Sequence, residues 1–169
     1  MNEHLLFDFL AQHNIQYTIY RHQPVFTSEE VPVIVGTDGP ARIPGLPSKN
    51  LFLREDANRT FFLVSVAEHK RTDLKELSNV LKCGRFSFGK SEDLLALINL
   101  TPGSVTPFGL MFDKEKKVTF VLDQDFVHAS VVQFHPMRND MTITLTPQDF
   151  LTCMEKMGHA PQIINIPVK

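Results

Sequence analysis

The sequence is poor in several residues and patterns that mark common protein classes. It has no tryptophan and only two cysteines, Cys83 and Cys153, which lie far apart and form no C-x-x-C pair. That spacing argues against a disulfide framework or a zinc ribbon and is typical of reduced thiols in the cytoplasm. The formal net charge of −2 gives no overall basic character, so any nucleic-acid site has to be a local patch, and we expect no DNA partner.

Long hydrophobic runs are also missing. No apolar stretch approaches the roughly 18 residues of a membrane span. The N-terminal stretch MNEHLLFDFLAQHN carries acids and no basic segment, unlike a signal peptide. Phenylalanine, by contrast, is abundant, with 14 copies among 169 residues. We therefore expect a single cytoplasmic domain over residues 1–169, built around a phenylalanine-rich core and not associated with a membrane.

Apolar spacing and capping residues predict a mixture of helices and strands. Helices are expected over residues 5–10, 27–32, 74–81, 92–98 and 147–157, and strands over 15–22, 50–54, 60–66, 85–88, 109–113, 117–123, 130–135, 141–145 and 161–166. The strands at 50–54 and 60–66, and those at 109–113 and 117–123, are expected to form hairpins. This order predicts an α+β fold with a mixed, strongly twisted, partly barrel-like sheet flanked by helices.

One stretch matches a nucleotide-binding motif by pattern alone. Gly84–Ser91, GRFSFGKS, fits the phosphate-loop pattern G-x-x-x-x-G-K-[ST], and Val118–Asp123 has the form of a magnesium-holding strand. The context argues against a nucleotide hydrolase, because a capped helix comes first and alternating phenylalanines predict a strand. We interpret Gly84 as the end of the preceding helix, Ser91 as the cap of the next one, and Asp123 as an ordinary strand-end acid.

Three other stretches carry stronger functional signals. Thr101–Leu110, TPGSVTPFGL, combines prolines and glycines in a pattern that predicts a rigid loop, with amides able to hold a carbonyl or an oxyanion. His135, just before Pro136, could donate a hydrogen bond or carry a proton. Lys49, at the start of an apolar strand, could meet a phosphate or polarise a carbonyl. The simpler interpretations are a tight turn, a backbone-bonded histidine and a solvated lysine.

Taken together, these stretches resemble the YbaK/prolyl-tRNA-synthetase-associated domain family of trans-editing aminoacyl-tRNA deacylases. Within it, the chain is most similar to the free-standing branch that removes alanine from mischarged tRNA(Pro). The resemblance covers nearly the whole chain and depends on an ordered set of segments: VFTSEE, SKNLFLR, FFLV, HKRTDLKEL, RFSF, PGSVTPFGL, VVQFHPMRN and GHAPQII.

The resemblance implies an activity and a set of site residues. The reaction would be hydrolysis of the ester between an amino acid and a ribose hydroxyl of the terminal adenosine, by direct attack of water, without a metal or another cofactor. The neighbouring ribose hydroxyl of the substrate would help to position that water. Catalytic roles fall on Lys49, Gly103 and His135, and substrate-binding roles on Asn50, Ser104, Val105, Thr106, Pro107, Phe108, Gly109 and Asn139. The segment Ser28–Val31 would meet the acceptor end of the tRNA.

Other expectations concern selection and partners. A small apolar pocket would admit alanine and exclude proline, with Leu53, Val105 and Phe108 as candidate walls that also suit plain core. Local basic residues could contact the acceptor stem, or could simply be solvated: Arg42, Lys49, Lys70 and Arg71. The expected partners are mischarged tRNA and, as a further candidate, prolyl-tRNA synthetase. Two alternatives stay open: a non-catalytic module that binds tRNA or a synthetase, and editing of tRNA charged with serine or cysteine.

Overall fold

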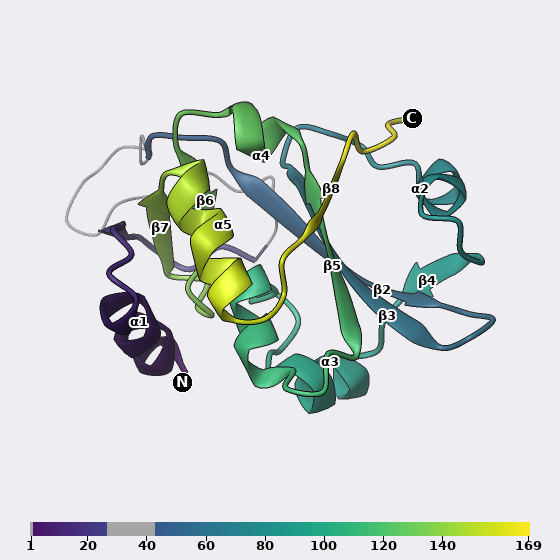
Figure 1. Cartoon of the computed structure of the whole chain (residues 1–169), viewed down its shortest axis with the longest axis horizontal. Helices are drawn as coiled ribbons and strands as arrows, with labels where there is room; N and C mark the ends of the chain where they lie inside the picture. The colour runs from purple at the N-terminus through teal and green to yellow at the C-terminus, as the bar shows by residue number, and fades with distance from the viewer. Residues whose placement is uncertain (1, 27–42) are drawn as a thin grey trace.

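The computed structural model describes residues 2–26 and 43–169, which form two β-sheets covered by helices (Figure 1). The helices are α1 (Glu3–Gln12), α2 (Leu74–Val80), α3 (Ser91–Ile98), α4 (Asp125–His128), α5 (Pro147–Lys156) and the 3₁₀ helix η1 (Pro107–Phe112). The strands are β1 (Thr18–Arg21), β2 (Ser48–Glu55), β3 (Thr60–Ala67), β4 (Phe86–Phe88), β5 (Val118–Asp123), β6 (Val132–Phe134), β7 (Met141–Leu145) and β8 (Gln162–Ile164). The helix expected at 27–32, with its Thr27–Glu30 cap, and the segment Ser28–Val31 lie outside the described residues.

The strand pairing is mixed, as the sequence predicts. The larger sheet has the order β4-β2-β3-β5-β8, in which β2 pairs antiparallel with β3 and β4, while β5 pairs parallel with β3 and β8. The smaller sheet has the order β1-β7-β6 and is antiparallel. This confirms the α+β fold class. The strands of the described part of the chain form two sheets and close no barrel.

A phenylalanine-rich core joins the smaller sheet to α5 and η1. The ring of Phe134 in β6 stacks on Phe150 of α5 with centroids 4.2 Å apart, and Phe108 of η1 meets both rings edge-on. Figure 1 shows α5 lying across β6 and β7. Aromatic pairs of this kind add roughly 0.5–1.5 kcal/mol each beyond the area they bury. No helix within the described ranges is long and apolar enough to cross a membrane.

The hairpin predicted over 109–113 and 117–123 is wrong. Pro107–Phe112 forms the 3₁₀ helix η1, in which the Gly109 N–H donates to the Thr106 carbonyl at 3.1 Å. Pro107 stands in the first turn, where its fixed φ suits a helix and its missing N–H costs nothing. The strand β5 instead pairs with β3 and β8. The short helix α4, for which we predicted nothing, follows β5 directly.

The stretch that matches a phosphate loop forms the edge strand β4 and the start of α3. The Gly89 N–H donates to the Phe52 carbonyl of β2 at 2.9 Å, so this amide is used in strand pairing and is not available to a phosphate. The N-cap of α3 is Lys90, one residue before the predicted Ser91, and it makes no side-chain capping bond. A strand in this position cannot wrap its amides around a phosphate. The structure therefore supports the strand interpretation.

Gly84 does not end a helix, which corrects the prediction. The helix α2 ends at Val80, and the left-handed residue after it is Lys82. Gly84 instead lies against the buried carboxylate of Glu55, which accepts its N–H at 2.9 Å. A Cβ at Gly84 would lie 2.5 Å from Glu55 Oε1. Although burial alone would raise it, bonds from Thr60, Gly84 and other donors hold the pKa of Glu55 below its ordinary value.

Asp123 is a buried structural group and more than an ordinary strand-end acid. Its side chain is fully buried and accepts the Ala67 N–H at 3.1 Å and the Asp125 N–H at 3.1 Å. The Lys70 ammonium lies 2.9 Å from it and 3.1 Å from Asp125. Although burial opposes the charge, these two acids raise the pKa of Lys70. The carboxylate therefore ties the end of β3 to the end of β5.

We expect Asp123→Asn to destabilise the fold by about 3 kcal/mol, because it leaves a mostly buried Lys70 without its nearest anion. The measurement is the free energy of unfolding in urea. Glu115→Gln is the matched control: it breaks the exposed pair with Lys117, whose side chain is 60% exposed, and should change stability by less than about 0.5 kcal/mol. Equal losses in both variants would contradict a structural role for Asp123.

Candidate functional site

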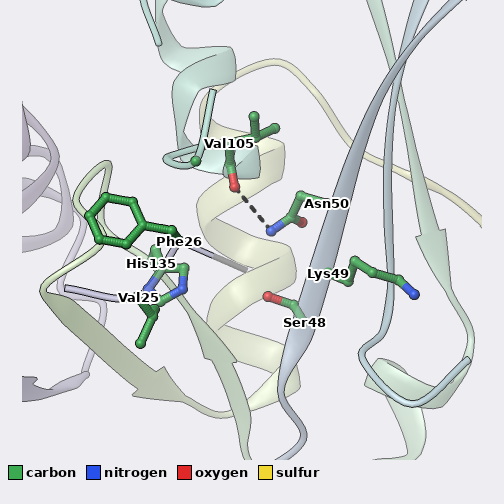
Figure 2. Close-up of a pocket in the computed structure, with 8 residues that line it drawn as sticks. Val25, Phe26, Ser48, Lys49, Asn50, Val105 and His135 are labelled. Carbon is green, nitrogen blue, oxygen red and sulfur yellow. Dashed lines mark hydrogen bonds between the residues drawn. The ribbon is translucent and has the colours of Figure 1, made fainter. Parts of the chain in front are cut away.

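A pocket of about 190 Å³ opens where the start of β2, the loop before η1 and the end of β6 meet. Figure 2 shows the side chains that line it. They come from segments far apart in the sequence, and the lining is mixed, with apolar groups beside polar ones. The lining residues are Val25, Phe26, Ser48, Lys49, Asn50, Gly103, Val105 and His135.

Backbone contacts at the start of β2 bring it next to β6. Leu46 pairs with Val132, and the Gln133 side chain donates to the carbonyls of residues 43, 44 and 45 at 2.8–3.1 Å. Gly45 has a positive φ of 104°, and a Cβ there would lie 2.8 Å from the Val131 carbonyl oxygen. Only glycine fits such a close approach. These contacts set Asn50 and His135 on opposite sides of one pocket.

The loop between α3 and η1 contains a tight turn. The Ser104 N–H donates to the Thr101 carbonyl at 3.1 Å, and Gly103 has a φ of 89°. Proline at the second position and glycine with positive φ at the third are the pattern of a type II turn. The Ser104 amide is thus committed to the turn. The amides of Gly103 and Val105, which both line the pocket, have no acceptor within residues 2–26 and 43–169.

Asn50 connects this loop to the larger sheet. Its Nδ2 donates to the Val105 carbonyl at 3.2 Å, and its Oδ1 accepts the Ser65 hydroxyl at 2.5 Å. Ser65 lies on β3 directly opposite Asn50 and is fully buried. Figure 2 shows the Asn50 side chain directed toward Val105. The amide therefore fixes the distance between β2 and the loop on the pocket side of the sheet.

His135 is held in one tautomer. Its Nδ1 lies 2.7 Å from the Met141 carbonyl, which can only accept, so Nδ1 carries the proton. Burial lowers the pKa of His135; the Met141 bond opposes this shift, and the nearby His22 adds to it. The two rings are 6.0 Å apart, and His22 bonds Thr142 at 2.9 Å. The neutral ring leaves Nε2 as an acceptor at the pocket.

Lys49 lies on the other face of β2 from Asn50. Its Nζ donates to the Lys70 carbonyl at 2.6 Å, and Figure 2 shows its side chain directed away from Val105 and His135. Alternation along a strand requires this arrangement, because neighbouring residues point to opposite faces. Of the proposed basic patch, Lys70 is engaged with Asp123 and Asp125, Arg71 is exposed, and Arg42 lies outside the described residues.

Several predicted site residues do not line the pocket. Thr106, Pro107, Phe108 and Gly109 are buried at the start of η1, and Leu53 belongs to the core on the opposite face of β2. Ser104 is used in the turn. The Asn139 carbonyl accepts the Val25 N–H at 3.0 Å and so supports the wall of the pocket indirectly.

Sequence reasoning missed Val25, Phe26, Ser48, Ser65 and His22. Alternation along β2 would have placed Ser48 beside Asn50, because they are two residues apart. No pattern in the sequence marks the buried Ser65 or the histidine pair, since both depend on contacts between strands.

Burial raises the pKa of the Cys153 thiol to about 12, so this cysteine is an inert core residue. The described residues contain no group of three His, Cys, Asp or Glu side chains placed to hold a metal.

The fold and pocket define a small α+β domain with a pocket between the start of β2 and a glycine-containing loop. Comparison with known proteins identifies the family. The Aminoacyl-tRNA editing domain family matches residues 22–153. The chain belongs to this family, which confirms the resemblance seen in the sequence.

Individual relatives cover nearly the whole chain. It is 36% identical over 160 residues to prolyl-tRNA synthetase associated domain-containing protein 1 of Danio rerio, covering 94% of this chain and 84% of that protein. It is 31% identical over 157 residues to the prolyl-tRNA editing protein ProX of Acetoanaerobium sticklandii, covering 93% of each. A solved structure assigned as a candidate trans-editing enzyme for prolyl tRNA synthetase has the same fold, with a TM-score of 0.70, 15% identity, and 99% and 98% of the two chains covered.

We expect the stability of the protein to fall as the pH drops from about 7 to about 5.5, partly because of His135. The unfolded chain takes up a proton near pH 6.5, whereas burial lowers the pKa of the folded imidazole, so the folded protein takes up less of a proton in this range. The free energy of unfolding should therefore depend less on pH in His135→Asn, whose amide can still donate to Met141. The measurement is urea unfolding at both pH values. Identical pH slopes in the two proteins would contradict this account.

Proposed function

We propose that this protein is a trans-editing hydrolase that deacylates mischarged tRNA, with Ala-tRNA(Pro) as its substrate. The observation that carries the proposal is a pocket in an editing domain that Gly103 and Val105, from the loop before η1, line together with Asn50 and His135. The names of its relatives, which refer to prolyl-tRNA editing and to association with prolyl-tRNA synthetase, support the choice of tRNA(Pro).

In the proposed reaction water is the nucleophile, so the protein has to stabilise an oxyanion and need not supply a nucleophilic side chain. Water adds to the ester carbonyl carbon, the bond from that carbon to the ribose oxygen breaks, and the ribose oxygen takes a proton. The products are a free amino acid and a tRNA with a free terminal hydroxyl. The amides of Gly103 and Val105 would hold the carbonyl oxygen and stabilise the charge that develops on it, without reorganisation at the moment of reaction.

His135 would orient the substrate through its unprotonated Nε2. With Nδ1–H committed to Met141, Nε2 can accept a hydrogen bond from the substrate ammonium, the ribose hydroxyl or the attacking water. The lowered pKa keeps the ring neutral at physiological pH, which preserves that acceptor. The substrate's own ribose hydroxyl would help to position the water, so the mechanism needs no protein side chain as a general base.

Lys49 would contribute through the terminal nucleotide. In the present structure its ammonium is satisfied by the Lys70 carbonyl on the far face of β2. To meet a phosphate of the acceptor end, the side chain would have to give up that carbonyl. This exchange is reasonable for a flexible ammonium with three donors.

Selection would depend on size. At about 190 Å³ the pocket is smaller than the roughly 300–1,000 Å³ of sites for drug-sized ligands. It suits a short side chain such as that of alanine. A synthetase that must bind proline cannot strongly reject a smaller amino acid, because a methylene is worth only about 1–3 kcal/mol. A second, smaller pocket would correct this error if it admitted alanine and excluded proline.

The partners in this proposal are the acceptor end of a mischarged tRNA, including its terminal adenosine, and prolyl-tRNA synthetase. The compartment in this proposal is the cytoplasm, where charged tRNA is used.

The test is deacylation of Ala-tRNA(Pro) beside Pro-tRNA(Pro) and tRNA charged with serine or cysteine, in EDTA and without nucleotide. We expect loss of alanine while proline is retained. His135→Ala and Lys49→Ala should each lower the rate about tenfold or more, equivalent to about 1.4 kcal/mol. Lys117→Ala, which changes an exposed lysine in the β5 region, is the matched control and should leave the rate unchanged.

Other outcomes have definite meanings. Hydrolysis of the serine or cysteine ester alone would keep the reaction and change the substrate. Absence of turnover with every charged tRNA, in a protein that still binds tRNA, would contradict the proposed activity and favour a non-catalytic binding module.

A further inference from the structure

The polar pair formed by Ser65 and Asn50 lies near the open end of the β2–β3 hairpin and is followed by three apolar pairs. The two residues are directly opposite in the register, on the face of the sheet that carries the pocket. Ser65 itself is fully buried and does not line the pocket. A buried hydroxyl is costly unless it is bonded, and within the described residues the Ser65 hydroxyl is bonded to Asn50.

The direction of both hydrogen bonds is determined by chemistry. The Val105 carbonyl can only accept, so the Asn50 amide must turn its Nδ2 toward the loop. Its Oδ1 then faces Ser65, which must donate. If Ser65 lost its hydroxyl, Oδ1 would have no protein donor in the described part of the chain. The amide could then rotate or recruit water, and its bond to Val105 would weaken.

We propose that Ser65 is a positioning residue for the editing reaction, acting through Asn50 on the loop that contains Gly103 and Val105. The inference rests on the proposed function, because it assigns to Ser65 the placement of the two amides that hold the aminoacyl carbonyl. Ser65 touches no substrate. Its hydroxyl fixes the side-chain amide of Asn50, and that side chain fixes the Val105 carbonyl. The backbone N–H groups of Gly103 and Val105 are thereby held in position.

The consequence is specific to the transition state. Oxyanion donors stabilise developing charge only when they are already in place, and small misplacements of a site cost large factors in rate. A loop that is less well held would still admit the substrate. Loss of the Ser65 hydroxyl should therefore lower kcat and leave KM nearly unchanged.

The experiment compares Ser65→Ala with Ser78→Ala in the intact protein, using deacylation of Ala-tRNA(Pro) and the melting temperature. Ser78 is the matched control because it is also buried and its hydroxyl bonds a carbonyl, that of Lys75, at 2.7 Å in α2. We expect kcat to fall about tenfold in Ser65→Ala, the scale of one lost hydrogen bond, and to stay unchanged in Ser78→Ala. Ser65→Cys keeps the size and a weak donor, and should restore part of the rate.

A double variant tests whether Ser65 acts through Asn50. Ser65→Ala should have no further effect on kcat in the Asn50→Ala background, because the contact that it supports is already absent. Additive losses would overturn the proposal, and so would equal losses in Ser65→Ala and Ser78→Ala.

Amide NMR spectra separate this inference from the proposed function. In Ser65→Ala, but not in Ser78→Ala, the resonances of the Asn50 side-chain amide and the Val105 backbone amide should shift. If the wild-type protein deacylates no charged tRNA, the editing proposal fails, and shifted resonances still establish the structural link. Unchanged resonances together with an unchanged kcat would refute the positioning role itself.

Discussion

The register of the β2–β3 hairpin is the constraint on which the site depends. It places Asn50 opposite Ser65 on the pocket face and Lys49 opposite Val66 on the other. Because side chains alternate, a shift of one residue would carry Asn50 out of the pocket and bring Lys49 into it. The register is fixed at one end by the buried carboxylate of Glu55, which bonds Asn58 in the turn and Thr60 at the start of β3. At the other end of β3, Asp123 accepts the Ala67 N–H and ties β3 to β5.

Buried polar groups fix the geometry of this protein at several such points. Asp113, for example, accepts the N–H groups of Lys117 and Val118 and bonds His159 at 3.1 Å, which ties the start of β5 to the segment that follows α5. Groups of this kind are costly when unpaired, so each one excludes alternative packings more strongly than an apolar contact of the same size. A phenylalanine core alone would tolerate repacking; the polar contacts select one arrangement.

The sequence predicts the class of this fold well, because most of its information is local. Alternation and turn residues find the β2–β3 hairpin, and Thr146 with Pro147 correctly marks the start of α5. The failures occur where long-range contacts decide. Pro107–Phe112 is apolar enough for a strand, yet it forms a 3₁₀ helix packed against Phe134 and Phe150. The role of Gly84 likewise depends on Glu55, 29 residues away.

The same distinction applies to the site. Pro102 and Gly103 predict their turn from local sequence alone. The link from Ser65 through Asn50 to Val105, in contrast, joins three separate segments. What results is a pocket whose polar groups are mostly neutral dipoles: backbone amides, a carboxamide and an imidazole held neutral by burial. Fixed dipoles need no counterion and little reorganisation. In the proposed reaction the substrate would supply the charges, through its ammonium and phosphates, and the protein would supply placement, for which buried hydrogen bonds between strands are suited.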